Sequence, residues 1–491
     1  MKDTSGPLRH PEAGRARDVT RDAVVIVPGI MGSELRDART GDLLWGLKPR
    51  MIGRALGRDG GLAALHVTEA ELAAERPVRV RASGLLAFPA WLPVLRGAEP
   101  YHDLCRTVLG AVADERAILR FAYDWRLSVA YNGGLLAEEA RRHLDTWTAT
   151  VTRSPELRGL CTDGMPRLVF VAHSMGGLVT RSALARQGDL ASDTRTVITL
   201  GTPFLGAAKA ALMLNGGRNA SGAEAAVRDR AQAMAATMPG VYDLVPDYRC
   251  VDEGRDVIRL TPAMIAGIGG DPYLGATAAG FREAMRSEPP PRLPDHRAVY
   301  GTSQPTVQSI RIDSGVVHPQ HRAFRADARG LLVRDANGMP VWSDRQGDGT
   351  VYRDAASGGT GKPVPLPLQH GALAKDRHAL AYVHGVLTEQ EPHTGPPMAP
   401  GELGLDLPDA GVIAGRPWRL RLTGRTRPTG VTCEIVQVET GATISRPRPS
   451  TSDGGLTATV TLPVPGLYRV GVHGSDRKRV TQFVMVFEPE P

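Results

Sequence analysis

The sequence is poor in cysteine and has no long apolar run. The four cysteines, Cys105, Cys161, Cys250 and Cys433, are isolated along 491 residues. This spacing fits neither a paired-cysteine metal motif nor a small disulfide scaffold, so we expect reduced thiols. No apolar stretch approaches the roughly 20 residues that span a bilayer, and the polar N-terminal segment lacks the apolar core of a secretion signal. These absences predict a cytoplasmic protein.

Aromatic residues are also scarce, at 5% of the chain, and the basic residues form no tract. The net charge is +7, but Lys and Arg are scattered among acidic residues and are not interleaved with aromatics, so we expect no nucleic-acid partner. The positive charge is compatible with a weak, transient contact with anionic membrane surfaces. His318 and His321 lie in a polar loop and are expected to be exposed rather than metal ligands. We expect no metal and no cofactor.

The length and the 42% apolar content predict two or three domains. After a flexible lead at 1–21, short apolar runs alternate with helical segments, which predicts a parallel α/β sheet within a domain at 22–390. The expected strands are 23–28, 117–122, 168–173, 196–200 and 298–301, and the expected helices are 101–113 and 134–150. Residues 204–294 are Ala-rich and helical, with no convincing strand, and predict an inserted cap. Residues 331–334 and 341–342 predict a local hairpin.

A Pro-rich stretch at 391–400 predicts a linker. Beyond it, short β-type runs separated by turn residues predict a small all-β sandwich at 401–491. These runs are 418–422, 432–438, 456–462, 467–472 and 482–487. We see no internal repeat.

The most informative segment is Leu168–Leu178. Its apolar run stops abruptly at Ser174, with the small residues Ala172 and Gly176 two positions to either side, and a helix-compatible sequence follows. This is the pattern of a nucleophile elbow, where the strained strand-to-helix turn leaves no space for bulky neighbours. The pattern predicts that Ser174 is a nucleophile.

A serine hydroxyl needs a histidine to take its proton and a carboxylate to orient that histidine. Asp348, in a glycine-bracketed loop, is the predicted acid, although Asp-Gly is also typical of a hairpin turn. His370 precedes the last helix of the domain and is the predicted base. His378 is the alternative, but its spacing from neighbouring apolar residues indicates an exposed helix position. His173, beside the nucleophile, is expected to pack or to hydrogen-bond under the elbow.

The tetrahedral intermediate of acyl transfer needs backbone N–H donors around its oxyanion. Met175, which directly follows the nucleophile, is expected to supply one. The loop at Gly29–Gly32 follows an early strand, and its glycines allow close approach, so Ile30 is expected to supply the other, with Met31 as its competitor.

Several motifs together resemble the lecithin:cholesterol acyltransferase-like family, which includes lysosomal phospholipase A2 and phospholipid:diacylglycerol acyltransferase. They occur in the family's order and span roughly residues 22–388. The motifs are Val27–Leu35, Phe121–Arg126, Ala172–Gly177, Leu200–Gly206, Met238–Pro246 and Gly347–Val351. Ala172 stands where many members have glycine.

The resemblance implies an α/β-hydrolase sheet with an inserted helical cap, a serine acyl-enzyme and lipid esters as substrates. Carried over by motif, Ser174 is the nucleophile, Asp348 the acid and His370 the base, and the amides of Ile30 and Met175 form the oxyanion hole. The block Tyr123–Arg126 is expected to brace the edge of the sheet. The C-terminal β segment lies outside the resemblance.

We therefore predict a serine acylesterase or O-acyltransferase acting on lipid esters or phospholipids, with water or an alcohol as acceptor. Phe88–Leu95 and the cap helices are candidates for an acyl-chain pocket or an interfacial patch, and ordinary core packing is an equal alternative. One alternative function is a binding or targeting protein that uses the β domain, with a protein partner, on a hydrolase scaffold. Another is a small-molecule or peptide hydrolase of the same fold.

Overall fold

The computed structural model describes most of the chain. The described residues are 19–46, 63–74, 78–86, 101–161, 164–216, 229, 231–286, 293–327, 331–357, 363–390, 404–407, 412–423, 425–438, 440–452, 455–474 and 479–488. Most of the predicted N-terminal lead, Phe88–Leu95 and the predicted linker at 391–400 lie outside the described residues.

The central element is a six-stranded sheet in the order β15-β10-β7-β6-β1-β5, and every pair of neighbours in it is parallel. Its strands are β1 (Ala23–Val27), β5 (Ile118–Arg120), β6 (Leu168–His173), β7 (Thr194–Leu200), β10 (Arg297–Gly301) and β15 (Pro363–Leu366). All residues of β1 and β6 are buried, as expected for parallel strands covered on both faces. The predicted parallel α/β sheet is confirmed.

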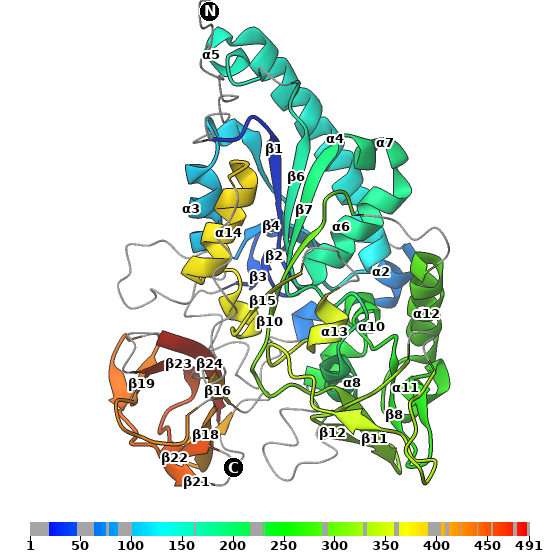
Figure 1. The fold of residues 1–491 in the computed structure, drawn as a ribbon, viewed down its shortest axis with the longest axis vertical. Helices are drawn as coiled ribbons and strands as arrows, with labels where there is room; N and C mark the ends of the chain where they lie inside the picture. The colour runs from blue at the N-terminus through cyan, green and yellow to red at the C-terminus, as the bar shows by residue number, and fades with distance from the viewer. Residues whose placement is uncertain are drawn as a thin grey trace, which may run out of the picture.

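Helices cover the sheet in two layers (Figure 1). Helices α3 (His102–Gly110) and α14 (Arg377–Leu387) pack together on one face, while α4 (Val129–Arg153) and α6 (Met175–Arg186) pack together on the other. The side chain of Ser128 caps α4 by accepting the N–H of Tyr131 at 3.1 Å. Since all strands run the same way, the loops at their carboxyl ends meet at one edge, and this edge carries the candidate site.

The cap contains the predicted helical segments α8 (Ala208–Asn215), α10 (Pro239–Asp243), α11 (Pro262–Gly267) and α12 (Pro272–Arg286). The expectation that it has no strand was wrong. Strands β8 (Arg249–Asp252) and β9 (Val257–Arg259) join β11 (Ser309–Asp313) and β12 (Val316–Gln320) in a four-stranded sheet. The runs in the cap are short, and β8 pairs with β11 far along the chain, so local patterning did not reveal the sheet.

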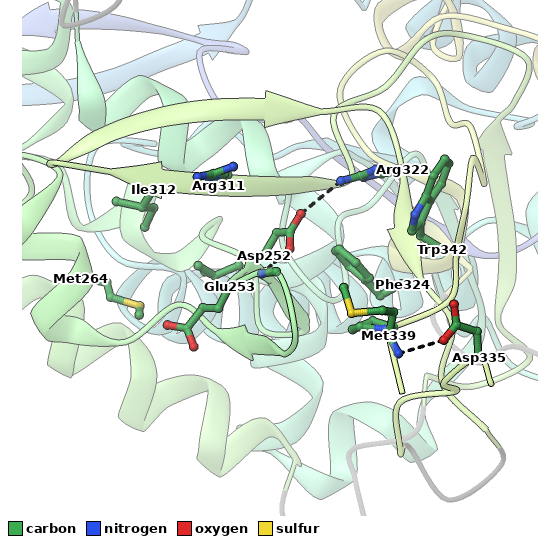
Figure 2. A pocket seen from close by; sticks show the side chains of 13 residues that line it. Asp252, Glu253, Met264, Arg311, Ile312, Arg322, Phe324, Asp335, Met339 and Trp342 are labelled. Carbon is green, nitrogen blue, oxygen red and sulfur yellow. Dashed lines mark hydrogen bonds and ion pairs between the residues drawn. The ribbon is translucent and has the colours of Figure 1, made fainter. Parts of the chain in front are cut away.

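A cavity of about 670 Å³ lies beside this small sheet (Figure 2). The guanidinium of Arg322 lies 4.5 Å from the centre of the Trp342 ring and 3.2 Å from a carboxylate oxygen of Asp252. The predicted hairpin forms the neighbouring wall, where the N–H of Val341 donates to the carbonyl of Val333 at 2.8 Å. The guanidinium of Arg322 and the ring of Trp342 therefore pack against each other in the lining of this cavity.

Smaller elements complete the first part of the chain. They are β2 (Ser33–Asp37), β3 (Leu43–Trp45), η1 (Ala63–Leu65), α2 (Glu69–Ala74), β4 (Val80–Leu85), η3 (Glu115–Ala117), α5 (Pro155–Arg158), α7 (Gly188–Ser192), β13 (Ala323–Phe324), β14 (Trp342–Ser343), α13 (Arg353–Ala356) and η4 (His370–Ala372). Within the described residues, no helix combines the length and the apolarity needed to cross a membrane.

The C-terminal segment forms two sheets that share one apolar core. The first is β16-β18-β22-β21 and the second is β17-β24-β23-β19-β20. The strands are β16 (Gly404–Asp406), β17 (Val412–Ile413), β18 (Pro417–Thr423), β19 (Thr432–Gln437), β20 (Thr443–Ser445), β21 (Ser450–Ser452), β22 (Gly455–Thr461), β23 (Gly466–His473) and β24 (Arg479–Phe487). Alternate residues of β18 and β22 are buried, as in a sandwich with one solvated face. Pairing is antiparallel except between β17 and β24.

Candidate active site

The loop between β6 and α6 holds Ser174 in a strained conformation, with φ 52° and ψ −127°. A non-glycine residue adopts this backbone only where the surrounding structure imposes it. Gly176 provides part of that constraint, because a Cβ at this position would lie 2.4 Å from the carbonyl oxygen of Pro28. The strand, the strained serine and the helix of a nucleophile elbow are thus present. Residue 176 must be small because the backbone at the end of β1 lies directly against it.

The structure brings Ser174, His370 and Asp348 together in one hydrogen-bonded chain. The Nε2 atom of His370 lies 2.8 Å from Ser174 Oγ, and its Nδ1 atom lies 2.7 Å from Asp348 Oδ2. Because a carboxylate only accepts, Nδ1 carries the proton and Nε2 is free to accept from the serine hydroxyl. His378, the alternative base, is exposed on α14 as expected.

Backbone amides fix the carboxylate of Asp348. Its Oδ1 atom accepts the N–H groups of Thr350 and Val351 at 2.9 and 2.7 Å, and this leaves Oδ2 for the histidine. The loop is also a tight turn, because Gly347 and Tyr352 form an antiparallel bridge. The Asp-Gly sequence therefore forms a turn, and in that turn the carboxylate of Asp348 faces His370. Both interpretations of this sequence are correct.

Two glycines that the sequence analysis did not single out make space for the acid and the base. Gly201 directly follows β7 and has φ +64°, and a Cβ there would lie 3.0 Å from His370 Nδ1 and 3.2 Å from Asp348 Oδ2. At Gly301, the end of β10, a Cβ would lie 2.3 Å from the Cβ of Asp348. A glycine at the end of a predicted strand, facing the edge where loops converge, is the signal that could have identified both.

The loop at Gly29–Gly32 lies directly against the nucleophile. A Cβ at Gly29 would come within 2.8 Å of Ser174 Cβ. Met31 has φ 63°, and its carbonyl accepts the indole N–H of Trp45 at 2.9 Å. Met175 is the first residue of α6, where backbone N–H groups have no partner within the helix. Met175 thus directly follows Ser174, and the Gly29–Gly32 loop contacts Ser174 through Gly29. The assignment of Ile30, or of its competitor Met31, as the second donor stays a prediction.

Behind the serine, Tyr101 and His173 link this loop to the base. The N–H of Gly29 donates to the Tyr101 hydroxyl at 2.8 Å, and that hydroxyl lies 2.9 Å from His173 Nδ1. The other ring nitrogen of His173 lies 3.2 Å from the carbonyl oxygen of His370. Burial, with the neighbouring His370, lowers the pKa of His173 to about 3, so its ring is neutral. A neutral ring accepts from the tyrosine at Nδ1 and donates from Nε2.

His173 therefore forms hydrogen bonds beneath the elbow, as we expected. The contact of Tyr101 with the site was not predicted. Nothing in the sequence around Tyr101, at the start of a helix far from the elbow, marks it as a partner of the site.

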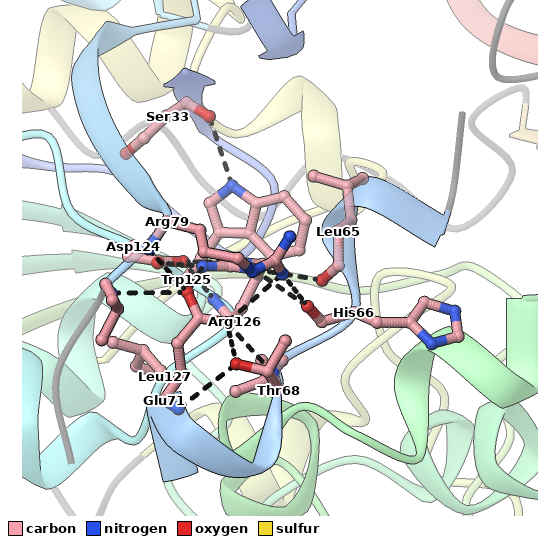
Figure 3. A network of polar contacts seen from close by, with 12 residues as sticks. Ser33, Leu65, His66, Thr68, Glu71, Arg79, Asp124, Trp125, Arg126 and Leu127 are labelled. Atoms are coloured by element: carbon pink, nitrogen blue, oxygen red, sulfur yellow. Dashed lines mark hydrogen bonds and ion pairs between the residues drawn. The ribbon is translucent and has the colours of Figure 1, made fainter. Parts of the chain in front are cut away.

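Asp124 and Arg126, of the block Tyr123–Arg126, lie in a buried polar network (Figure 3). Arg126 pairs with Asp124 at 2.7 Å and with Glu71 at 3.4 Å, and the side chains of Arg126 and Glu71 are fully buried. Burial alone would raise the pKa of Glu71, but the Thr68 amide, Arg126, and the amide and charge of Arg79 together lower it to about 2. The network ties α2 to the loop after β5, which agrees with the bracing role expected of this block.

Two negative findings concern metals and thiols. Among the described residues, no group of three or more His, Cys, Asp and Glu side chains is placed to hold a metal ion. No disulfide joins any of the four cysteines, all of which lie in the described residues.

The parallel sheet, the elbow at its edge and the Ser174–His370–Asp348 chain are the architecture of an α/β-hydrolase. Residues 67–264 match the family profile of lecithin:cholesterol acyltransferase. This match confirms the family resemblance over the segment that contains the elbow and the Tyr123–Arg126 block. Asp348 and His370 lie beyond the matched residues.

Solved structures with some similarity include lipases. A chain of the Tle4–Tli4 complex is 15% identical, with 74% of this chain and 98% of that chain covered and a TM-score of 0.42. The mature form of the Bacillus licheniformis lipase BlEst2 is 14% identical, with 75% and 91% covered and a TM-score of 0.30. The Lin-41 filamin domain is 11% identical, with 18% and 94% covered and a TM-score of 0.16. These scores are too low to define a relationship, and no curated protein matches the sequence.

Proposed function

We propose that this protein is a serine acylesterase or O-acyltransferase that acts on lipid esters or phospholipids through an acyl-enzyme at Ser174. The observation that supports the proposal is the continuous hydrogen-bonded chain from Ser174 through His370 to Asp348, with distances of 2.8 and 2.7 Å. The strained elbow presents the hydroxyl, and the acid is fixed by two backbone amides. Such an arrangement activates a serine for attack on an acyl carbonyl.

In the first half of the reaction, Ser174 Oγ forms a bond to the acyl carbon as its proton passes to His370 Nε2. The carbonyl oxygen becomes an oxyanion, and the amides of Met175 and Ile30 are the proposed donors to it. When the intermediate collapses, the bond from the acyl carbon to the alcohol oxygen breaks, and His370 returns the proton to the leaving alcohol. The carboxylate of Asp348 accepts the Nδ1–H of His370 and stabilises the imidazolium.

In the second half, water or an acceptor alcohol gives its proton to His370 Nε2 and attacks the acyl-enzyme. The bond to Ser174 Oγ then breaks, the serine regains its proton, and a free acid or a new ester leaves. The choice of acceptor depends on how the cap excludes water and holds a second substrate. Hydrolysis and transacylation are therefore proposed together.

The lipid substrate class is supported by the family match and by the exposure of apolar side chains on the cap. Leu205, Met213 and Tyr273 are 36%, 41% and 73% exposed. Exposed apolar side chains on the cap suit a transient contact with a lipid surface. The proposed location, cytoplasmic with transient contact at membranes, rests on the sequence alone, as does a protein partner for the β domain.

Incubation with phospholipid vesicles, with and without a long-chain alcohol, tests this function. We expect wild type to release lysophospholipid with fatty acid, or with the new ester when alcohol is present, and Ser174→Ala to release neither. Fluorophosphonate labelling is measured in parallel. Turnover of short esters only, with labelling intact, would support the small-molecule hydrolase instead. Absence of both labelling and turnover would support a binding protein on a hydrolase scaffold.

A further inference from the structure

Strand β16 of the C-terminal segment contacts the loop that carries the candidate base. The side-chain amide of Gln369 donates a hydrogen bond to the carbonyl of Leu405, which is buried. Gln369 directly precedes His370 and is the N-cap residue of the three-residue turn η4. No residue of η4 is fully buried, and hydrogen bonds hold the turn. The backbone N–H of His370 donates to the carbonyl of Asp348 at 2.9 Å, and His173 Nε2 lies 3.2 Å from the carbonyl oxygen of His370. The hydrogen bond from Gln369 to β16 is a further restraint, on the residue directly before the base.

The same strand also contacts the support of the acid loop. Gly404 is packed so closely that a Cβ there would lie 2.3 Å from Gln304 Oε1 and 2.3 Å from Thr423 Oγ1. Gln304 is 3% exposed, and its backbone N–H donates to the carbonyl of Gly347 at 3.0 Å. Gly347 immediately precedes Asp348. One short strand thus contacts the residue beside the base and the residue that holds the loop of the acid.

From this juxtaposition we propose that β16 is a positioning element for the active site. Through Gln369 and Gly404, the C-terminal segment holds the loops of His370 and Asp348 in the relative position that proton transfer from Ser174 requires. This inference rests on the proposed function, because it assumes that His370 and Asp348 act on Ser174. It assigns the β segment a role within the catalytic unit, in addition to any role in binding a partner.

The geometry of the active site is sensitive to small displacements. Proton transfer requires His370 Nε2 to stay within hydrogen-bond reach of Ser174 Oγ, and an error of about 1 Å in such a geometry can cost as much as about 100-fold in rate. A single hydrogen bond is worth only about 0.5–1.5 kcal/mol, which corresponds to about two- to tenfold in a rate. Loss of the Gln369 contact is therefore expected to slow the reaction without abolishing it.

Two variants of the full chain remove the two contacts separately. Gln369→Leu removes the donor and keeps the approximate size, and Gly404→Val inserts a side chain between β16 and Gln304. Matched controls are Gln187→Leu, at an exposed position beyond α6, and Thr459→Val, at an exposed position of β22 in the same sheet as β16. If Gly404→Val proves poorly folded, Gly404→Ala applies the same test with a smaller side chain.

The measurements are fluorophosphonate labelling rate and the kcat and KM for a short p-nitrophenyl ester, with thermal unfolding as a check on folding. We expect each test variant to lower kcat and labelling by about two- to tenfold with KM nearly unchanged, and the controls to match wild type. Because both variants loosen one strand, the double variant should lose less than the product of the single losses.

Two results distinguish the failures. Wild type that is neither labelled nor active would refute the proposed function. Wild type that is labelled and active, with folded test variants equal to their controls, would overturn the role of β16.

Discussion

Replacing Tyr101 with phenylalanine removes one oxygen atom from the buried chain behind Ser174. Tyr101 is 2% exposed, and its hydroxyl accepts the N–H of Gly29 and faces His173 Nδ1. The substitution leaves two buried polar groups without a partner, and each such group costs about 1–3 kcal/mol. The expected loss in the free energy of unfolding is therefore about 2–6 kcal/mol. The same change frees the Gly29–Gly32 loop, so labelling of Ser174 should also slow.

Urea unfolding followed by tryptophan fluorescence measures the first effect, because Trp125 and Trp147 are buried in the α/β core. The matched control is Tyr242→Phe in the cap, where the hydroxyl accepts the N–H of Asp271 at 2.6 Å and donates to the carbonyl of Ala236 at 2.8 Å. That variant should also lose stability but keep the wild-type labelling rate with a small phosphonate. Tyr101→Phe with an unchanged unfolding midpoint and unchanged labelling would refute the reasoning.

Three further substitutions test other parts of the account. In Asp348→Asn, the two amides hold Oδ1, so the new NH2 group faces His370, imposes the wrong tautomer and should lower kcat on the order of 10⁴-fold in ester hydrolysis. Arg126→Met removes the ion-pair partner of the buried Asp124 and leaves the buried Glu71 with Arg79 alone, and it should cost about 3–5 kcal/mol in urea unfolding near neutral pH. Burial raises the pKa of Asp243 to about 6, above its unfolded value, so its contribution to stability is present in acid and is lost as the pH rises from about 4 to 6. Asp243→Asn should remove that loss, and equal pH dependence of unfolding in variant and wild type would contradict it.

The α/β core could be predicted because its signals are local. The apolar runs of β1, β6 and β7 are continuous, as buried parallel strands require, and the helix after Ser174 follows without a break. The loop positions of Ser174, Asp348 and His370 follow from the strand order, because parallel strands deliver their carboxyl-end loops to one edge. Sequence reasoning therefore placed all three side chains that the structure brings together.

The parts that were missed depend on contacts between distant segments. Strands β8 and β9 are short, and their sheet is completed by residues beyond the cap. Tyr101 contacts His173, which lies 72 positions along the chain. Gly404, in a strand of the C-terminal segment, contacts Gln304 of the α/β domain. In each case the residue alone gives no local periodicity or turn signal, and only the packed structure reveals its neighbour.

The central claim is that Ser174 carries the acyl group, and trapping that intermediate tests it most directly. Wild type is mixed with a phospholipid, quenched in acid within the first turnover and digested, and the peptides are analysed by mass. The account predicts an acyl group on the peptide that contains Ser174, and no acylated peptide in Ser174→Ala. An acyl group on another residue, or phospholipid turnover by Ser174→Ala at the wild-type rate, would contradict it.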